Sequence, residues 1–174
     1  MQVITVVVRV FQIIFATIVL GLSVTLAKGQ AIGSAPAITG YAGFTGALGI
    51  VASLVGIAAL FVSSLDGLIT WILDGLASLA FLAGGIAFAV ILKGTNCEDK
   101  YTIWNNQILS GGCVTVKDEQ RCYNNDHPNN LKSRCTSAKA DSAFMFIDFA
   151  FSLAVIGCSF FLSGRRGVGR SNVV

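Results

Sequence analysis

The sequence has few charged residues, almost no proline and a single histidine. Only 12% of its 174 residues are Asp, Glu, Lys or Arg, whereas soluble domains carry about 25%. This shortage excludes an ordinary soluble globular domain. Two prolines beside 19 glycines suit helices that pack closely in lipid. The one histidine, His127, follows a polar stretch and precedes Pro128, so we interpret it as a surface residue rather than a catalytic base.

Recognisable catalytic and nucleotide-binding motifs are also missing. The sequence contains no glycine-rich phosphate loop, no cluster of metal ligands and no Ser/His/Asp set. The formal net charge of +3 is too small, and too evenly mixed within the polar region, to indicate nucleic acid. We therefore expect no enzyme activity, no catalytic residue, no metal site and no nucleic-acid partner.

Four apolar segments, each about long enough to cross a bilayer as a helix, alternate with polar stretches. The first is too long for the apolar part of a signal peptide, and its basic residue, Arg9, lies inside the segment rather than before it. We predict an all-α integral membrane protein, a four-transmembrane-helix bundle in one domain over residues 1–164. The expected spans are 3–27, 39–62, 68–92 and 141–163, and a short basic tail follows at 165–174.

A polar loop, residues 94–140, is expected between the third and fourth spans. It contains four of the five cysteines, which are Cys97, Cys113, Cys122 and Cys135. An even number of cysteines in one loop is typical of two disulfides in an oxidising compartment. A zinc site is the less favoured use, because the loop has no Cys-x-x-Cys pair. Four cysteines allow three connectivities, and the sequence does not select one.

The same loop and the tail predict the orientation in the membrane. Arg165, Arg166 and Arg170 follow the last span closely, and basic residues near a span favour the cytosolic side. The loop carries basic residues of its own, which would point the other way, but disulfides need an oxidising environment. We predict a multi-pass plasma-membrane protein with both termini cytosolic and an extracellular disulfide-containing loop.

Two charged residues interrupt the apolar segments at a matching depth. Arg9 lies about six residues, or ~9 Å, into the first span. Asp74 lies a similar distance past the Asp66-Gly67 turn, into the third span. A charge inside the bilayer costs roughly 2.5–3.5 kcal/mol on insertion scales, so each should have a partner. We predict an intramembrane ion pair between Arg9 and Asp74, joining the first and third helices.

The fourth span contains a further acid and the fifth cysteine. Asp148 lies about seven residues in from the loop side, too far from the depth of Arg9 to pair with it. We expect it to contact loop residues or hydroxyls such as Ser23 or Thr25, or to be protonated; a proton relay or substrate contact is the functional alternative. Cys158 is expected to pack as a small apolar residue, with palmitoylation as the alternative.

The second span carries glycine at every third position, and such a row lacks side chains and lets a neighbouring backbone approach closely. We expect it to be a packing face within the bundle, with an oligomer or lipid contact face as the alternative. The row comprises Gly40, Gly43, Gly46 and Gly49.

Together these features resemble the MARVEL-domain superfamily over roughly residues 3–163. The likeness rests on four spans, the Arg9-Val10-Phe11-Gln12 element in the first, and a cysteine loop between the third and fourth. Leu73-Asp74-Gly75-Leu76, followed by Ala83-Gly84, is similar to the fungal branch called non-classical export proteins. The family's arginine in helix one and aspartate in helix three correspond to Arg9 and Asp74.

The resemblance implies a non-enzymatic organiser of plasma-membrane lipid microdomains. Members of the fungal branch are associated with furrow-like compartments (eisosomes), sphingolipid sensing and export of proteins without signal peptides. The implied partners are membrane lipids, including sphingolipid or sterol, further copies of the chain and other membrane proteins, without a cofactor. A tetraspanin is less favoured, because the loop has Gly111-Gly112-Cys113 in place of Cys-Cys-Gly. A small channel or transporter, or an accessory subunit of a larger complex, stays an alternative.

Overall fold

The computed structural model describes residues 2–62, 68–116, 119–122 and 128–168, and within these ranges the side chains of 2, 114–115, 119–122, 128–129 and 158–168 are not described. Four long helices dominate it: α1 (Gln2–Lys28), α2 (Ala37–Ala58), α3 (Leu68–Ile91) and α5 (Pro128–Val168). All four are long and apolar enough to cross a membrane. The predicted four-span, helical fold is confirmed.

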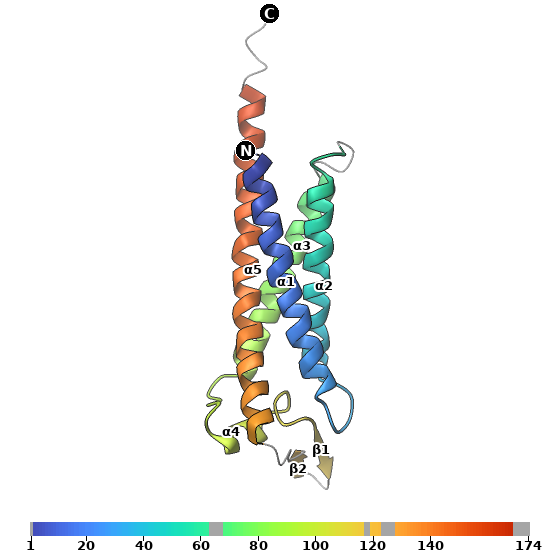
Figure 1. Ribbon diagram of the computed structural model, residues 1–174, viewed down its shortest axis with the longest axis vertical. Helices are drawn as coiled ribbons and strands as arrows, with labels where there is room; N and C mark the ends of the chain where they lie inside the picture. Colours follow the sequence, from blue (N-terminus) through green and yellow to red (C-terminus); the bar gives the residue numbers. More distant parts are fainter. Residues whose placement is uncertain (1, 63–67, 117–118, 123–127, 169–174) are drawn as a thin grey trace, which may run out of the picture.

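The helices form a closed ring of neighbours rather than a flat layer. α1 packs against α2 and α5, and α3 packs against the same two helices. Figure 1 shows that α1 begins and α5 ends near the same end of the bundle, while the loop elements lie at the opposite end. This arrangement places the polar side chains of α1, α3 and α5 in a common interior.

Small side chains on α2 allow this close packing. Its buried residues are all small and recur every three or four positions, which is the spacing of one helix face. They are Thr39, Ala42, Thr45, Gly46, Gly49, Ala52, Ser53 and Gly56. The large side chains of the core come instead from the other helices, with Phe81 and Phe88 from α3 and Met145 from α5.

Helix α5 begins much earlier than the sequence predicted. The fourth span was expected from residue 141, but α5 starts at Pro128, so part of the predicted loop is helical. Proline suits the first helical position, because its missing N–H would have no partner there. Leu131, Cys135 and Ala138 are buried along this extension, and their spacing of four and three residues marks one helical face. Polar residues surround this buried face and lower the mean hydropathy of the segment, so hydropathy alone did not predict a helix there.

The rest of the loop is folded and disulfide-bonded. It contains the short helix α4 (Lys100–Trp104) and an antiparallel hairpin of β1 (Cys113–Val116) and β2 (Glu119–Cys122), neither of which the sequence predicted. A disulfide joins Cys97 to Cys135 on α5.

The loop also docks on the connection between α1 and α2. The carbonyl oxygen of Gly111 accepts hydrogen bonds from the backbone N–H groups of Ala31 (2.7 Å) and Ile32 (3.1 Å). Arg134 on α5 donates to the carbonyl oxygens of Leu109 (3.0 Å), Ile108 (2.9 Å) and Leu26 (3.3 Å). The start of α5 therefore holds the loop and the end of α1 together.

Candidate functional site

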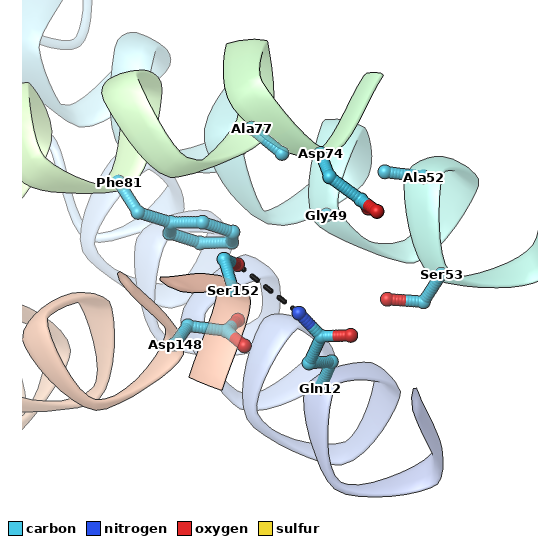
Figure 2. Close-up of a pocket in the computed structure, with 9 residues that line it drawn as sticks. All are labelled: Gln12, Gly49, Ala52, Ser53, Asp74, Ala77, Phe81, Asp148 and Ser152. Carbon is cyan, nitrogen blue, oxygen red and sulfur yellow. Dashed lines mark hydrogen bonds between the residues drawn. The ribbon is translucent and has the colours of Figure 1, made fainter. Parts of the chain in front are cut away.

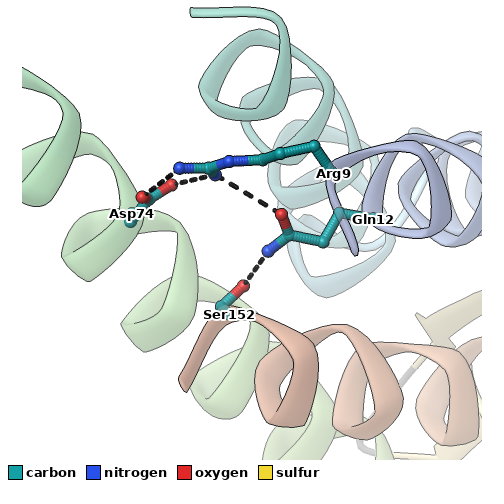
Figure 3. A network of polar contacts seen from close by, with 4 residues as sticks. All are labelled: Arg9, Gln12, Asp74 and Ser152. Carbon is teal, nitrogen blue, oxygen red and sulfur yellow. Dashed lines mark hydrogen bonds and ion pairs between the residues drawn. The ribbon is translucent and has the colours of Figure 1, made fainter. Parts of the chain in front are cut away.

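Arg9 and Asp74 meet in the interior of the bundle. The guanidinium donates from Nη1 to Oδ1 and from Nη2 to Oδ2 of Asp74, both at 2.5 Å (Figure 3). Arg9 is 2% exposed and Asp74 is 3% exposed. A two-point contact of this kind fixes the orientation of both groups, and each charge compensates the other away from water. The structure thus brings together the two residues that the sequence had matched by depth.

Gln12 extends this pair to a third helix. It lies one turn after Arg9 on α1, and its Oε1 accepts a hydrogen bond from Arg9 Nη1 at 3.4 Å. Its Nε2 donates to the hydroxyl oxygen of Ser152 on α5 at 3.1 Å. Figure 3 shows the resulting chain from Asp74 to Ser152. One polar network therefore connects α3, α1 and α5.

Helix α2 contributes space rather than a polar group. A Cβ on Gly56 would lie 2.5 Å from Arg9 Nε and 2.6 Å from Nη2, closer than non-bonded atoms approach. The guanidinium therefore lies directly against the backbone of α2 at Gly56. Gly56 lies seven residues after Gly49 and so on the same helical face, a spacing that was the available signal for its role.

The predicted glycine face is divided between packing and exposed positions. A Cβ on Gly46 would lie 2.8 Å from the backbone nitrogen of Leu20 on α1, and one on Gly49 would lie 2.6 Å from the Phe81 ring. Gly40 has no neighbour within 4 Å, and Gly43 meets only the Cβ of Ser23 at 3.8 Å.

The packing expected of the row is found at Gly46 and Gly49, whereas Gly40 lies on the side left to the oligomer or lipid alternative. Successive steps of three residues rotate by 300°, so positions nine apart, such as Gly40 and Gly49, point to opposite sides of an α-helix.

Asp148 lies closer to this network than predicted. It was expected about seven residues into its span, but α5 begins at Pro128, which places Asp148 more than five helical turns from the start. It is one turn from Ser152, and both line a small gap in the bundle. Neither of its carboxyl oxygens has a hydrogen-bond partner among the described residues. Early initiation of α5 thus brings Asp148 to the level of the Arg9 network.

The hydroxyls proposed as partners of Asp148 bond elsewhere. Ser23 donates to Oδ2 of Asp141 at 2.8 Å, and Thr25 donates to the carbonyl oxygen of Gly21 at 2.7 Å. Asp141 is fully buried, and its bond to Ser23 is a second polar contact between α1 and α5 after Gln12–Ser152. The sequence reading had used Asp141 only as the boundary of a span. Its seven-residue spacing from Asp148 was the available signal that both acids share a helical face.

The gap between the helices is lined by polar and small residues, together with Phe81, from all four long helices. Figure 2 shows the carboxyl group of Asp148 beside Ser152 and facing the side of the gap where Gln12 lies. The lining side chains leave no space for a water molecule. They are Gln12, Gly49, Ala52, Ser53, Asp74, Ala77, Phe81, Asp148 and Ser152. A hydrated ion or a small metabolite does not fit in this arrangement.

The remaining predicted residues are placed only in part. Cys113 is also disulfide-bonded, and the register of the hairpin sets it opposite Cys122. His127 and the side chain of Cys158 lie outside the described residues. Among the described residues, no three His, Cys, Asp or Glu side chains are grouped so that they could hold a metal ion.

The sequence was compared with known protein families, curated proteins and solved structures. The family model named MARVEL, described as a membrane-associating domain, matches residues 2–158. No curated protein and no solved structure gives a match. The match covers all four candidate spans, the folded loop and each member of the polar network. The chain therefore belongs to the MARVEL family of membrane-associating domains.

Proposed function

We propose that this protein is a non-enzymatic organiser of lipid microdomains in the plasma membrane, in a compartment of the eisosome type. The proposal includes a response to sphingolipids or a link to unconventional protein export, as the similarity to the fungal branch implies. Proteins of the MARVEL family are generally non-enzymatic membrane proteins, which agrees with this role.

The observation that carries the proposal is how little of each span is buried. Between 22% and 44% of the most apolar window of each candidate span lies inside the bundle. The rest faces outward and presents large apolar side chains, including Val10, Phe44, Leu54, Leu79, Val90 and Leu153. In a membrane these faces contact lipid or other proteins. The protein thus offers contact surface on every side, as an organiser needs.

The interior favours an organiser over a channel. The charged groups that could line a pore, Asp74 and Asp148, face a gap without room for water. Asp74 is occupied by Arg9. Conduction needs a water-filled or ion-coordinating path, and the described residues form a closed core instead. An accessory subunit of a larger membrane complex is compatible with the same surface, and co-purification at fixed stoichiometry would favour it.

The proposed orientation places the loop outside the cell and the ends of α1 and α5 inside. The Cys97–Cys135 disulfide at the loop end of the bundle favours an oxidising compartment there. Arg165 and Arg166 lie in the last part of α5, at the other end, where basic residues favour the cytosol. Protease accessibility of the loop in intact cells, compared with permeabilised cells, tests this orientation.

Detergent-free extraction of native membrane patches tests the organiser role. The extracted particles should contain more than one copy of the protein and should be enriched in sphingolipid or sterol relative to the bulk membrane. A single copy in lipid of bulk composition would contradict the proposal. A liposome flux assay complements this experiment, because selective conductance would support the channel alternative.

A matched pair of variants makes the copy-number measurement specific. Gly40 on α2 and Gly75 on α3 both have open space where a Cβ would lie, so a side chain can be added at either position without a clash at its Cβ. If the exposed part of the glycine row contacts a second copy, Gly40→Leu lowers the copy number and Gly75→Leu does not. Equal copy numbers in both variants would contradict a contact at Gly40.

A further inference from the structure

Asp148 is a buried acid that the network of Arg9 does not use. It is 1% exposed, and both carboxyl oxygens lack a hydrogen-bond partner among the described residues. Figure 2 shows its carboxyl group within the polar gap, beside Ser152. An ionised carboxylate in such a place has neither water nor a counter-charge, and its desolvation is expensive. Some positively charged species must compensate it, or the group must be neutral.

The charges facing this gap can be assigned to each packed helix. α1 lines the gap with Gln12, and α3 lines it with Asp74, whose charge is already compensated by Arg9 of α1. The residues that α2 contributes, Gly49, Ala52 and Ser53, are uncharged. On α5 itself the nearest other acid among the described residues is Asp141, about two turns toward the loop and bonded to Ser23. Two carboxyl groups therefore line the gap, and the one guanidinium beside it is already paired with Asp74.

The size of the gap limits which positively charged species could neutralise Asp148. The lining side chains leave no room for a water molecule, so a cation with any of its hydration shell is excluded. A proton needs no such space. We propose that Arg9, Asp74 and Asp148 form a proton-binding site, in which two carboxyl groups share one guanidinium and one proton.

Since Asp74 and Asp148 line the same gap, the proposed site offers two positions for the proton. With the proton on Asp148, Arg9 pairs with Asp74 as in the structure. When the O–H bond of Asp148 breaks and one forms on Asp74, the net charge of the site stays the same. Gln12 also lines the gap, and its amide group bonds both Arg9 and Ser152. The Nε–H of Arg9 has no acceptor among the described residues.

Infrared spectroscopy of the full-length protein in lipid nanodiscs tests the site. A protonated carboxylic acid has a carbonyl stretch that a carboxylate lacks. The Asp141→Asn variant serves as the background, because it removes the other buried acid of α5 while keeping an oxygen to accept from Ser23. In this background we expect an acid signal at neutral pH that disappears on Asp148→Asn.

The decisive variant is Asp74→Asn in the same background. Arg9 then has no other carboxylate, so Asp148 should release its proton and pair with Arg9, and the acid signal should vanish although Asp148 is intact. Persistence of the signal would overturn the shared site, as would its absence from the background protein. If stability instead rises with sodium but not with choline chloride, the site binds a metal cation and the proposal fails.

Unfolding equilibria provide a second readout that does not depend on the signal. Asp148→Asn leaves the Arg9–Asp74 pair intact, and Asp74→Asn leaves Asp148 to replace it, so each single change has a modest effect. The double change leaves Arg9 uncompensated, and its unfolding constant should exceed the product of the single effects by roughly 100-fold or more. If the effect of the double change on the unfolding constant equals the product of the two single effects, the shared site is refuted. This measurement can be made even where a variant gives too little protein for spectroscopy.

Discussion

Replacing Gly56 by alanine tests whether the Arg9–Asp74 pair depends on the bare backbone of α2. The new methyl group would lie 2.5 Å from Nε and 2.6 Å from Nη2 of Arg9, about 1 Å inside normal contact. The guanidinium cannot retreat freely, because both of its terminal nitrogens bond Asp74 at 2.5 Å. The substitution should therefore force α2 outward or lengthen the ion-pair contacts.

The expected magnitude is a balance of two opposing effects. Overpacking of a tight interior costs typically 1–3 kcal/mol. Alanine in place of glycine within a helix favours folding by roughly 0.5–1 kcal/mol. We expect Gly56→Ala to lower the free energy of unfolding by about 1–2 kcal/mol. Gly40→Ala, where a Cβ meets nothing within 4 Å, should raise it by roughly 0.5–1 kcal/mol.

Reversible unfolding in lipid bicelles measures both changes on the same helix. A third variant identifies the cause: in an Arg9→Met background the guanidinium is gone, so adding Gly56→Ala should cost less than it does in the native protein. If Gly56→Ala is as stable as the native chain, or if Gly40→Ala is destabilised equally, the packing of Arg9 against α2 is not the reason that position 56 is glycine.

Three further predictions follow from the contacts. Arg9→Ala should cost about 3–5 kcal/mol of unfolding free energy, because Asp74 is left buried without its partner; native-like unfolding would refute the pairing. Replacing Cys97 and Cys135 by serine should cost about 4 kcal/mol, from a closed loop of 38 residues, and an unchanged unfolding midpoint would contradict it. Arg134→Lys should speed amide hydrogen exchange in residues 108–111, because one ammonium cannot reach carbonyls on both the loop and α1; native exchange rates would contradict this.

The sequence was sufficient for the four spans and for the meeting of Arg9 with Asp74. Apolar segment length determines the first, because a lipid environment permits few alternatives to a spanning helix. Depth determines the second, because a helix rises by a fixed amount per residue. Both inferences need only one-dimensional measurements along the chain.

Features that depend on rotation about the helix axis were predicted less well. The glycine row winds around α2, so Gly46 and Gly49 pack tightly against neighbouring helices while Gly40 contacts none of them. The start of α5 was missed because its buried face, at Leu131 and Cys135, is surrounded by polar residues. Because the depth of Asp148 was counted from the wrong starting residue, the sequence predicted it to lie far from Arg9.

The pairing of side chains across helices also required three dimensions. Gln12 and Ser152 are ordinary polar residues in the sequence, and only the approach of α1 to α5 turns them into a link. The cysteine connectivity was open for the same reason, because spacing alone did not show that the first cysteine of the loop would meet the extended start of α5.

The length of α5 has a mechanical consequence. Its 41 residues make a rod about 60 Å long, roughly twice the ~30 Å of the hydrocarbon layer. The disulfide fastens one end of the rod to the folded loop, and Ser152 engages the polar network far along the same rod. Because a continuous helix is stiff, a tilt imposed on the loop is transmitted to the level of Asp148. The folded loop and the polar network in the bundle are thus coupled mechanically through one continuous helix.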